Sequence, residues 1–404
     1  MSDVASVTLG IGAAPYQKTL AAALLREGML RRLFSAGPDL EVQDPRPDGR
    51  LEIVRRFPVN RLATRLVGGL WRRIPTPLRP AFPSMIPARL ADELRSRWIP
   101  PCSIFHGWIG FSLACIGSAK RQGAISLLEN PGSHPQRWHE AGMQECRTFG
   151  VNPRDRFIAI SARNARRMER EFAMCDRIVV PSSLSYRSFE EVGLAAKTVI
   201  VQTGVDTDFF SPAMTPEERP LFRACFVGRV ELAKGAGYLL QAWKRLNLAR
   251  AELVIVGDLK PEMSSLLRTY ADSSVRMTGI IQPQELAAIY RESDVFVLPS
   301  VNEGLAQVLL EAMASGLPLV ASDYSGADEL ITDGKEGFIV PVRDVDRLAE
   351  AILWCYQHRD DLRVMGQGAR AKIESQFTLE HYNQRQIALY RSLAGMQNPT
   401  PTLP

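Results

Sequence analysis

Residues 293–322, SDVFVLPSVNEGLAQVLLEAMASGLPLVAS, predict one strand–loop–helix–strand unit of a parallel sheet. The apolar run Val295–Leu298 indicates a buried strand that ends at a turn. A helical pattern follows over 306–315, Gly316 ends it, and Leu319–Ala321 begins the next strand. A loop and a helix N-terminus are therefore expected at the carboxyl end of a strand. Anions bind well at such a place, because free backbone N–H groups and the helix dipole point outward there.

Two glutamates, Glu303 and Glu311, bracket this predicted anion site. Like charges repel, so a carboxylate beside an anion needs a reason. One reason is a ligand with hydroxyl groups, since an ionised glutamate accepts hydrogen bonds from a sugar or a ribose. The alternative is that Glu303 only interacts favourably with the helix dipole and that Glu311 is an ordinary solvated helix residue.

The whole string resembles the signature of the retaining glycosyltransferases of family 4, P-S-x-x-E-G-x-x-x-x-x-x-E-A-M-A-x-G-x-P-V-V-A-S. The resemblance implies the α/β fold named GT-B, in which two Rossmann-like domains face each other across a cleft. It also implies a nucleotide-sugar site that includes Gly304 and Leu305, with Glu311 on the ribose and Glu303 on the sugar hydroxyls. Ala306 stands where the family usually has Gly or another small residue, which leaves less room for the donor.

A second motif, GRVELAKG over 228–235, follows an apolar run that predicts a strand over 224–227. Arg229 and Lys234 suit a diphosphate, since Arg grips two oxygens and Lys acts as a mobile point charge. Taken alone, they are better explained as solvated surface cations. The motif is similar to the family's G-R-L-x-x-x-K-G, however, and this similarity implies that both cations, together with Gly228, bind the donor diphosphate.

The first half of the chain offers weaker candidates at predicted strand ends. Strands over 102–105 and 124–128 end at His106 and Glu129, and His134 follows a few residues later. The family places a histidine after the second of these strands, where this chain has Glu129. Which of the three side chains reaches the reacting sugar stays open. Gly12, in the loop between the first predicted strand and helix, is expected to approach the donor phosphates.

The resemblance covers most of residues 176–393 and is thinner before them. We expect an acceptor-binding domain over 1–203 and a donor-binding domain over 204–376. A final helix over 377–396 is expected to cross back to the first domain, followed by a loose tail over 397–404.

Composition narrows the remaining possibilities. The 404 residues, 46% of them apolar, allow two or three domains, and a net charge of +5 is too small to argue for nucleic-acid binding. The six cysteines include no C-x-x-C pair, and no long apolar segment or secretory leader is evident. We therefore expect a cytoplasmic protein with no metal site and no cofactor other than the sugar nucleotide, which is its donor substrate.

Residues 55–79 form an unusually basic segment, with seven arginines and no acidic residue. On a helical wheel, Trp71 and several leucines share one half, and three of the arginines lie opposite. Such a segment can attach to the surface of an anionic membrane, and it fits equally well as an acceptor-domain helix packed on the core.

The expected activity is transfer of a sugar from a nucleotide diphosphate sugar to an acceptor hydroxyl, with retention of the anomeric configuration. We expect this activity in the assembly of a cell-surface polysaccharide or glycolipid. A GT-B epimerase or phosphorylase would use the same diphosphate site, and a catalytically silent GT-B scaffold is a third possibility. The sugar, the base, the acceptor and the oligomeric state are not encoded in any pattern that we recognise.

Overall fold

A computed structural model of the chain describes residues 5–11, 15–35, 53–54, 85–152, 162–213 and 220–397. Gly12, the basic segment 55–79 and the tail after residue 397 lie outside these ranges, so the predictions made for them are not tested by the structure.

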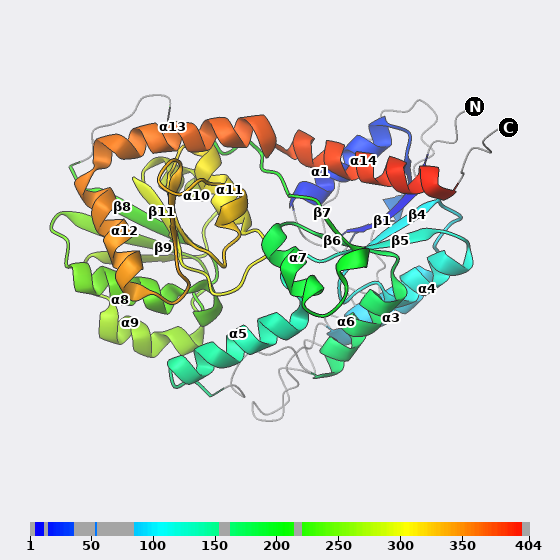
Figure 1. The fold of residues 1–404 in the computed structure, drawn as a ribbon, viewed down its shortest axis with the longest axis horizontal. Coiled ribbons are helices and arrows are strands. Elements are labelled where there is room, and N and C mark those ends of the chain that lie inside the picture. The colour runs from blue at the N-terminus through cyan, green and yellow to red at the C-terminus, as the bar shows by residue number, and fades with distance from the viewer. Residues whose placement is uncertain are drawn as a thin grey trace.

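A parallel sheet of seven strands organises the first domain (Figure 1). The strand order is β3-β2-β1-β4-β5-β6-β7. The strands are β1 (Val7–Ile11), β2 (Leu30–Ser35), β3 (Ile53–Val54), β4 (Ile104–Trp108), β5 (Ile125–Glu129), β6 (Arg177–Val180) and β7 (Thr198–Ile200). The helices are α1 (Pro15–Arg26), α3 (Met85–Ser96), α4 (Leu113–Arg121), α5 (Pro135–Thr148), α6 (Ala162–Met174), α7 (Ser183–Glu190), the short η3 (Ala195–Lys197) and, from the end of the chain, α14 (Leu379–Gln397).

A parallel sheet of six strands, in the order β10-β9-β8-β11-β12-β13, organises the second domain. The strands are β8 (Phe222–Val227), β9 (Ala251–Val256), β10 (Val275–Gly279), β11 (Val295–Leu298), β12 (Leu319–Ser322) and β13 (Gly337–Val340). The helices are α8 (Ala236–Leu246), α9 (Ser264–Tyr270), α10 (Pro283–Arg291), α11 (Gln307–Ala314), α12 (Val345–Gln357) and α13 (Arg359–Gln376), with the short η4 (Leu232–Lys234), η5 (Pro261–Met263) and η6 (Ala327–Glu329).

Both sheets are covered by helices on their two faces, which explains their continuous apolar strands. In the second domain every residue of β11 and β12 is buried. In the first domain, α1 and α14 pack on one face with Leu20, Tyr382 and Tyr390, and α4, α6 and α7 pack on the other with Ile116, Phe172 and Phe189. The carboxyl ends of the strands of both sheets are thereby free to face one shared cleft.

Two chain segments connect the domains side by side. Near residue 205 the chain enters the second domain, and near residue 378 it returns to the first, where α13 is followed by α14 (Figure 1). Val205 N–H donates to the Phe377 carbonyl at 2.9 Å, and Leu379 N–H donates to the Val205 carbonyl at 3.1 Å. The helix at the end of the chain therefore packs on the first domain, against α1. The domain boundary at residue 203 stays a prediction.

The α/β fold class predicted from the sequence is confirmed by these two sheets. The helical pattern of the sequence predicts a first helix over 17–30, and this boundary is wrong: α1 ends at Arg26, and Leu30 begins β2. Gly28 explains the stop, because its φ of +68° is a left-handed conformation typical of the residue after a helix.

Candidate functional site

A cleft of about 500 Å³ lies between the two domains, at the carboxyl ends of β4, β5, β8 and β11. The first domain contributes Tyr16, Trp108, Ile109, residues 130–133, Pro135, Trp138, Met168, Pro181 and Thr203. The second domain contributes residues 227–229, Glu231, Ala233, Lys234 and residues 302–308. The cleft therefore brings together Gly228, Arg229, Lys234, Glu303, Gly304 and Leu305 from the two predicted motifs of the second domain.

Lys234 and Glu303 form an ion pair at the centre of the second-domain side. The Ser300 hydroxyl donates to the same carboxylate oxygen at 3.1 Å, and the backbone N–H of Glu303 donates to the Tyr324 carbonyl at 2.9 Å. Both side chains are mostly buried, with 22% of Lys234 and 15% of Glu303 exposed. The Glu303 carboxylate is thus held at a fixed position beside a cation, within the wall of the cleft.

Arg229 pairs with a glutamate that the sequence analysis did not identify, Glu231. Its Nη2 lies 2.9 Å from Glu231 Oε1, and the Arg229 side chain is 57% exposed, so it can turn toward a ligand. Burial raises the pKa of Glu231, and the nearby Arg229 and Lys234 act against that rise. Glu231 stands two residues after Arg229 in a loop, where no strand or helix period marks it.

The loop that carries Lys234 is held tightly against the loop after β11. Gly235 has φ +71°, and a Cβ at this position would lie 1.9 Å from the Pro299 carbonyl oxygen. Only glycine fits there. The helix α11 begins next to this contact, and its N-cap residue Ala306 provides no side-chain hydrogen bond. Its first turn faces the cleft with Gln307 and Val308, as expected of an anion site.

Glu311 lies on α11 one turn beyond Gln307 but does not line the cleft. The Tyr290 hydroxyl donates to its Oε2 at 3.1 Å. Burial raises the pKa of Glu311 to about 7, and the hydrogen bond from Tyr290 partly offsets that rise. The carboxyl group is therefore poised between its two protonation states near neutral pH.

Glu129 and His106 lie together beneath the first-domain side of the cleft, and both are buried. His106 Nε2 is 3.5 Å from Glu129 Oε2, the Gln17 amide donates to the same oxygen at 3.2 Å, and His106 Nδ1 is 2.6 Å from the Tyr390 hydroxyl on α14. Burial raises the pKa of Glu129 to about 7 and lowers the pKa of His106 to about 3. Neither side chain lines the cleft, although their neighbours Tyr16 and Asn130 do.

His134 has a different place. It is the N-cap residue of α5, and its Nδ1 accepts a hydrogen bond from the backbone N–H of Gln136 at 3.3 Å. Its ring packs against Phe172 and Phe189, and burial lowers its pKa to about 4. It does not line the cleft. This placement favours a structural role for His134, whereas its contact with the sugar stays a prediction.

The two domains touch directly around the cleft. The Ser133 hydroxyl lies 2.7 Å from the Asn302 amide oxygen, and the Ser182 hydroxyl donates to the Gly304 carbonyl at 2.7 Å. The buried Glu145 on α5 accepts from the Tyr238 hydroxyl at 2.8 Å and from Arg343 Nε at 2.7 Å. These contacts hold the domains in a closed arrangement.

The described ranges contain no group of three or more His, Cys, Asp or Glu side chains that could hold a metal ion. Metal independence stays a prediction. Across the same ranges, every helix is too short or too polar to cross a membrane.

Comparison with known proteins finds a family model that matches the second domain. The family model described as "Glycosyl transferases group 1" matches residues 222–358, which carry Arg229, Lys234, Glu303 and Glu311. The second domain is a glycosyl transferases group 1 domain. The predicted relationship to the glycosyltransferases is thereby confirmed at this level.

Two curated relatives are similar to this chain in sequence. The amylovoran biosynthesis glycosyltransferase AmsK of Erwinia amylovora is 29% identical over 231 residues, which cover 54% of this chain and 56% of the relative. The GDP-mannose-dependent monoacylated alpha-(1-6)-phosphatidylinositol monomannoside mannosyltransferase of Corynebacterium glutamicum is 28% identical over 336 residues, covering 76% and 82%. The chain spans about half the length of the first curated relatives it matches, or less.

A solved structure is similar to the whole of the chain. The crystal structure of Alr3699/HepE from Anabaena, in complex with UDP-glucose, has a TM-score of 0.65 and 16% sequence identity. The superposition covers 96% of this chain and 99% of that one, and so includes both domains. The chain has the GT-B fold, as predicted.

Proposed function

We propose that this protein is a glycosyltransferase that moves a sugar from a nucleotide diphosphate sugar to an acceptor hydroxyl. The observation that carries the proposal is the pairing of Arg229 and Lys234 with Glu231 and Glu303 in the interdomain cleft, within a group 1 domain. HepE, which has the same fold, binds UDP-glucose in its crystal structure.

In the proposed mechanism the two cations exchange partners when the donor binds. A diphosphate carries more negative charge than a single carboxylate and attracts Lys234 away from Glu303 and Arg229 away from Glu231. Glu303 is then free to accept hydrogen bonds from sugar hydroxyls. As the bond between sugar and diphosphate breaks, negative charge grows on the leaving group, and the fixed cations stabilise that charge.

Retention of the anomeric configuration and metal independence belong to the same proposal, because the motifs resemble those of family 4. Two cations next to the uncapped start of α11 can offset the charge of a diphosphate, as a metal ion does elsewhere. Glu311 is proposed to bind the nucleotide ribose. Proton NMR of the product reports its anomeric configuration, and activity after treatment with a chelator reports the need for a metal.

The proposed acceptor is a lipid-linked sugar in polysaccharide or glycolipid assembly at the inner face of the cytoplasmic membrane. The names of the two relatives support this direction, since one acts in amylovoran biosynthesis and the other on a phosphatidylinositol mannoside. Seven arginines over 55–79 supply the charge for attachment to the membrane.

The nucleotide site is tested by removing its cations. Arg229→Ala and Lys234→Ala are each expected to lower turnover about a hundredfold, as the loss of one preorganised charge-stabilising group does elsewhere. Turnover is measured as nucleoside diphosphate release from whichever UDP-, GDP- or ADP-sugar protects best against thermal unfolding. Ligand at 100 times its dissociation constant adds about 2.7 kcal/mol of stability.

The matched control is Lys244→Ala, because Lys244 pairs with Asp272 on the outer surface of α8. Normal turnover in either cleft variant would contradict the proposed role of that cation. Product analysis with and without acceptor separates a transferase from an epimerase or phosphorylase, and the absence of protection by any sugar nucleotide would favour a silent scaffold.

Membrane attachment is tested by co-sedimentation with liposomes. Attachment is expected to need anionic lipid and to weaken as salt rises, since salt screens surface charges beyond roughly 8–10 Å. Replacing Arg61, Arg65 and Arg72 with Gln is expected to reduce co-sedimentation while activity on a soluble acceptor is kept. Equal co-sedimentation with neutral and with anionic liposomes would contradict this part of the proposal.

A further inference from the structure

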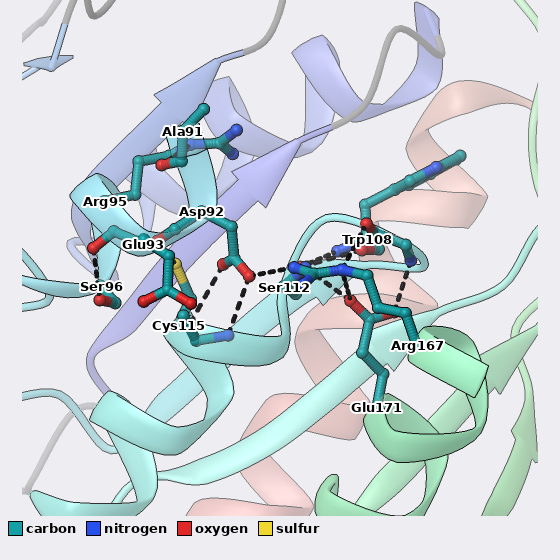
Figure 2. Close-up of polar contacts among 12 residues, drawn as sticks. Ala91, Asp92, Glu93, Arg95, Ser96, Trp108, Ser112, Cys115, Arg167 and Glu171 are labelled. Carbon is teal, nitrogen blue, oxygen red and sulfur yellow. Dashed lines mark hydrogen bonds and ion pairs between the residues drawn. The ribbon is translucent and has the colours of Figure 1, made fainter. Parts of the chain in front are cut away.

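The loop between β4 and α4 is held by charged side chains from α6 (Figure 2). Glu171 accepts hydrogen bonds from the backbone N–H groups of Gly110 at 2.5 Å and Ser112 at 2.9 Å. Arg167 Nε donates to the Gly110 carbonyl at 3.0 Å. The position of the loop therefore depends on two side chains one helical turn apart on another element.

A third charged residue, Asp92 on α3, completes the network. Its carboxylate pairs with Arg167 and accepts hydrogen bonds from the backbone N–H groups of Ala114 at 2.8 Å and Cys115 at 3.2 Å (Figure 2). Arg167 Nε also lies 3.6 Å from Glu171 Oε1. We call Asp92, Arg167 and Glu171 the buried triad. It joins α3, α6 and the start of α4 to a single loop.

The burial of the triad argues for a role beyond stability. Both carboxylates are fully buried and Arg167 is 9% exposed. Burial raises the pKa of Glu171 to about 7, although Gly110, Ser112 and Arg167 all act against the rise. Buried ion pairs are often no more stabilising than apolar residues of the same size, because each charge loses its hydration. What this triad supplies is a defined position for the loop backbone.

The residues that this loop and α6 present to the cleft are apolar. Trp108 ends β4, Ile109 begins the loop, and Met168 follows Arg167 on α6. A Cβ on Gly110 would lie 3.5 Å from the Met168 Cε, so the loop and the helix are in close contact. On the opposite side of the cleft stand the charged groups of the second domain, Arg229 and Lys234 among them. The charged side chains that line the cleft thus belong to the second domain, whereas Trp108, Ile109 and Met168 form an apolar part of the first-domain side.

We propose that Trp108, Ile109 and Met168 form a subsite for a sugar ring of the acceptor. Arg167 is the positioning residue, because it holds the loop that carries this subsite in place. Aromatic and apolar side chains pack on the C–H face of a pyranose, whereas a phosphate group would need cations here. The inference rests on the proposed transferase function and assigns its acceptor side. It places an uncharged pyranose, and no phosphate, next to Trp108.

The test compares the affinities for two ligands in the same variants. Methyl α-glucopyranoside and methyl α-mannopyranoside, in the presence of UDP, report on the subsite by NMR titration, and UDP alone reports on the second domain by calorimetry. Glu171→Gln keeps the shape but cannot accept both backbone N–H groups, because they bond to different carboxylate oxygens and one of these becomes an NH2 donor. Arg167→Lys keeps the charge but loses the fork that joins Gly110 to Asp92. Both variants, and Trp108→Ala, are expected to weaken pyranoside binding at least tenfold and to change UDP affinity less than twofold.

Hydrogen exchange provides a direct second readout. The amide protons of Gly110 and Ser112 are expected to exchange at least tenfold faster in Glu171→Gln. Asp176→Asn is the control, because Asp176 also accepts two hydrogen bonds, from Ser126, but at the opposite edge of the sheet. It is expected to lower the melting temperature with no change in pyranoside affinity.

Three outcomes would overturn the inference: no pyranoside binding to the wild-type protein, unchanged binding in all three variants, or equal losses for pyranoside and UDP. Equal losses would mean that the triad stabilises the fold in general. Failure of the transferase proposal would be seen separately, as no protection of the wild-type protein by any UDP-, GDP- or ADP-sugar.

Discussion

At the scale of single residues, the charged side chains that line the cleft are paired with one another. Lys234 pairs with Glu303 and Arg229 with Glu231, so the two cations and two carboxylates sum to no net charge. Because each cation has a carboxylate partner, the two cations do not destabilise the site by mutual repulsion. Each carboxylate is also held close to the proposed position of the donor. The two predicted glutamates differ in a way that an experiment can separate.

Glu311→Gln is expected to weaken the binding of free nucleoside diphosphate, because its proposed partner is the ribose. Glu303→Gln is expected to keep that affinity, since it leaves Lys234 free for the diphosphate, and to impair transfer, because the proposed partner of Glu303 is the sugar. Calorimetric titration with the diphosphate alone distinguishes them, and equal losses in both variants would refute the assignment.

The affinity of the wild-type protein for nucleoside diphosphate is expected to rise as the pH rises through about 7, because a Glu311 carboxylate, once ionised, accepts hydrogen bonds more strongly. Glu311→Gln is the control for ionisation of the nucleotide itself and is expected to show a weaker rise.

At the scale of elements, α1, β5 and α14 enclose Glu129 away from water. The burial of Glu129 raises its pKa from 4.5 to about 7. A raised carboxyl pKa favours the folded state fully below the unfolded pKa, and this contribution is lost as the pH rises through about 7. His106 stays neutral over this range because burial lowers its pKa to about 3.

The expected result is that Glu129→Gln gains stability relative to the wild-type protein between pH 5 and pH 8. A shift from 4.5 to about 7 corresponds to a change on the order of 3 kcal/mol. Thermal unfolding at both pH values measures it, with Glu140→Gln on the exposed side of α5 as the control. A difference that does not vary with pH would mean that Glu129 is ionised in the folded protein at pH 5.

The elements also show which parts of the structure can be predicted from sequence. The unit around Glu303 is predicted closely, because the helical period, the glycine that ends the helix and the family motif agree there. β2, β7 and α5 are missed, since LRRLFS mixes charges into a strand and α5 is polar on most of its surface. Arg229, Lys234 and Glu303 are found by motif. Glu231 is not, because it stands in a loop where no strand or helix period marks it. The buried triad is not, because Asp92 and Arg167 come from distant parts of the chain.

At the scale of the whole molecule, the domains meet with almost no space at one point. A Cβ on Gly304 would lie 2.2 Å from the Pro131 carbonyl oxygen, which belongs to the other domain. The closed arrangement therefore requires a residue without a side chain at this position. Family motifs mark this glycine, and its closeness to the first domain supplies a physical reason.

Gly304→Ala is expected to prevent full closure while each domain remains folded. Small-angle X-ray scattering should give a larger radius of gyration than for the wild-type protein, and turnover should fall at least tenfold, because the acceptor side no longer reaches the donor side. Gly395→Ala is the control, since nothing lies within 4 Å of a Cβ there. An unchanged radius together with normal turnover would contradict this account of closure.

The two segments that connect the domains, joined by hydrogen bonds between Val205 and Phe377, determine how domains can be exchanged between such proteins. The second domain is one uninterrupted length of chain, whereas the first domain is split and includes α14 from the other end of the sequence. A chimaera therefore needs two junctions, both within this hydrogen-bonded pair of segments, to replace the whole second domain in one exchange. Under the proposed division of substrates, the graft would bring a new nucleotide-sugar preference to an unchanged first domain, and truncation at either end could not achieve the same result.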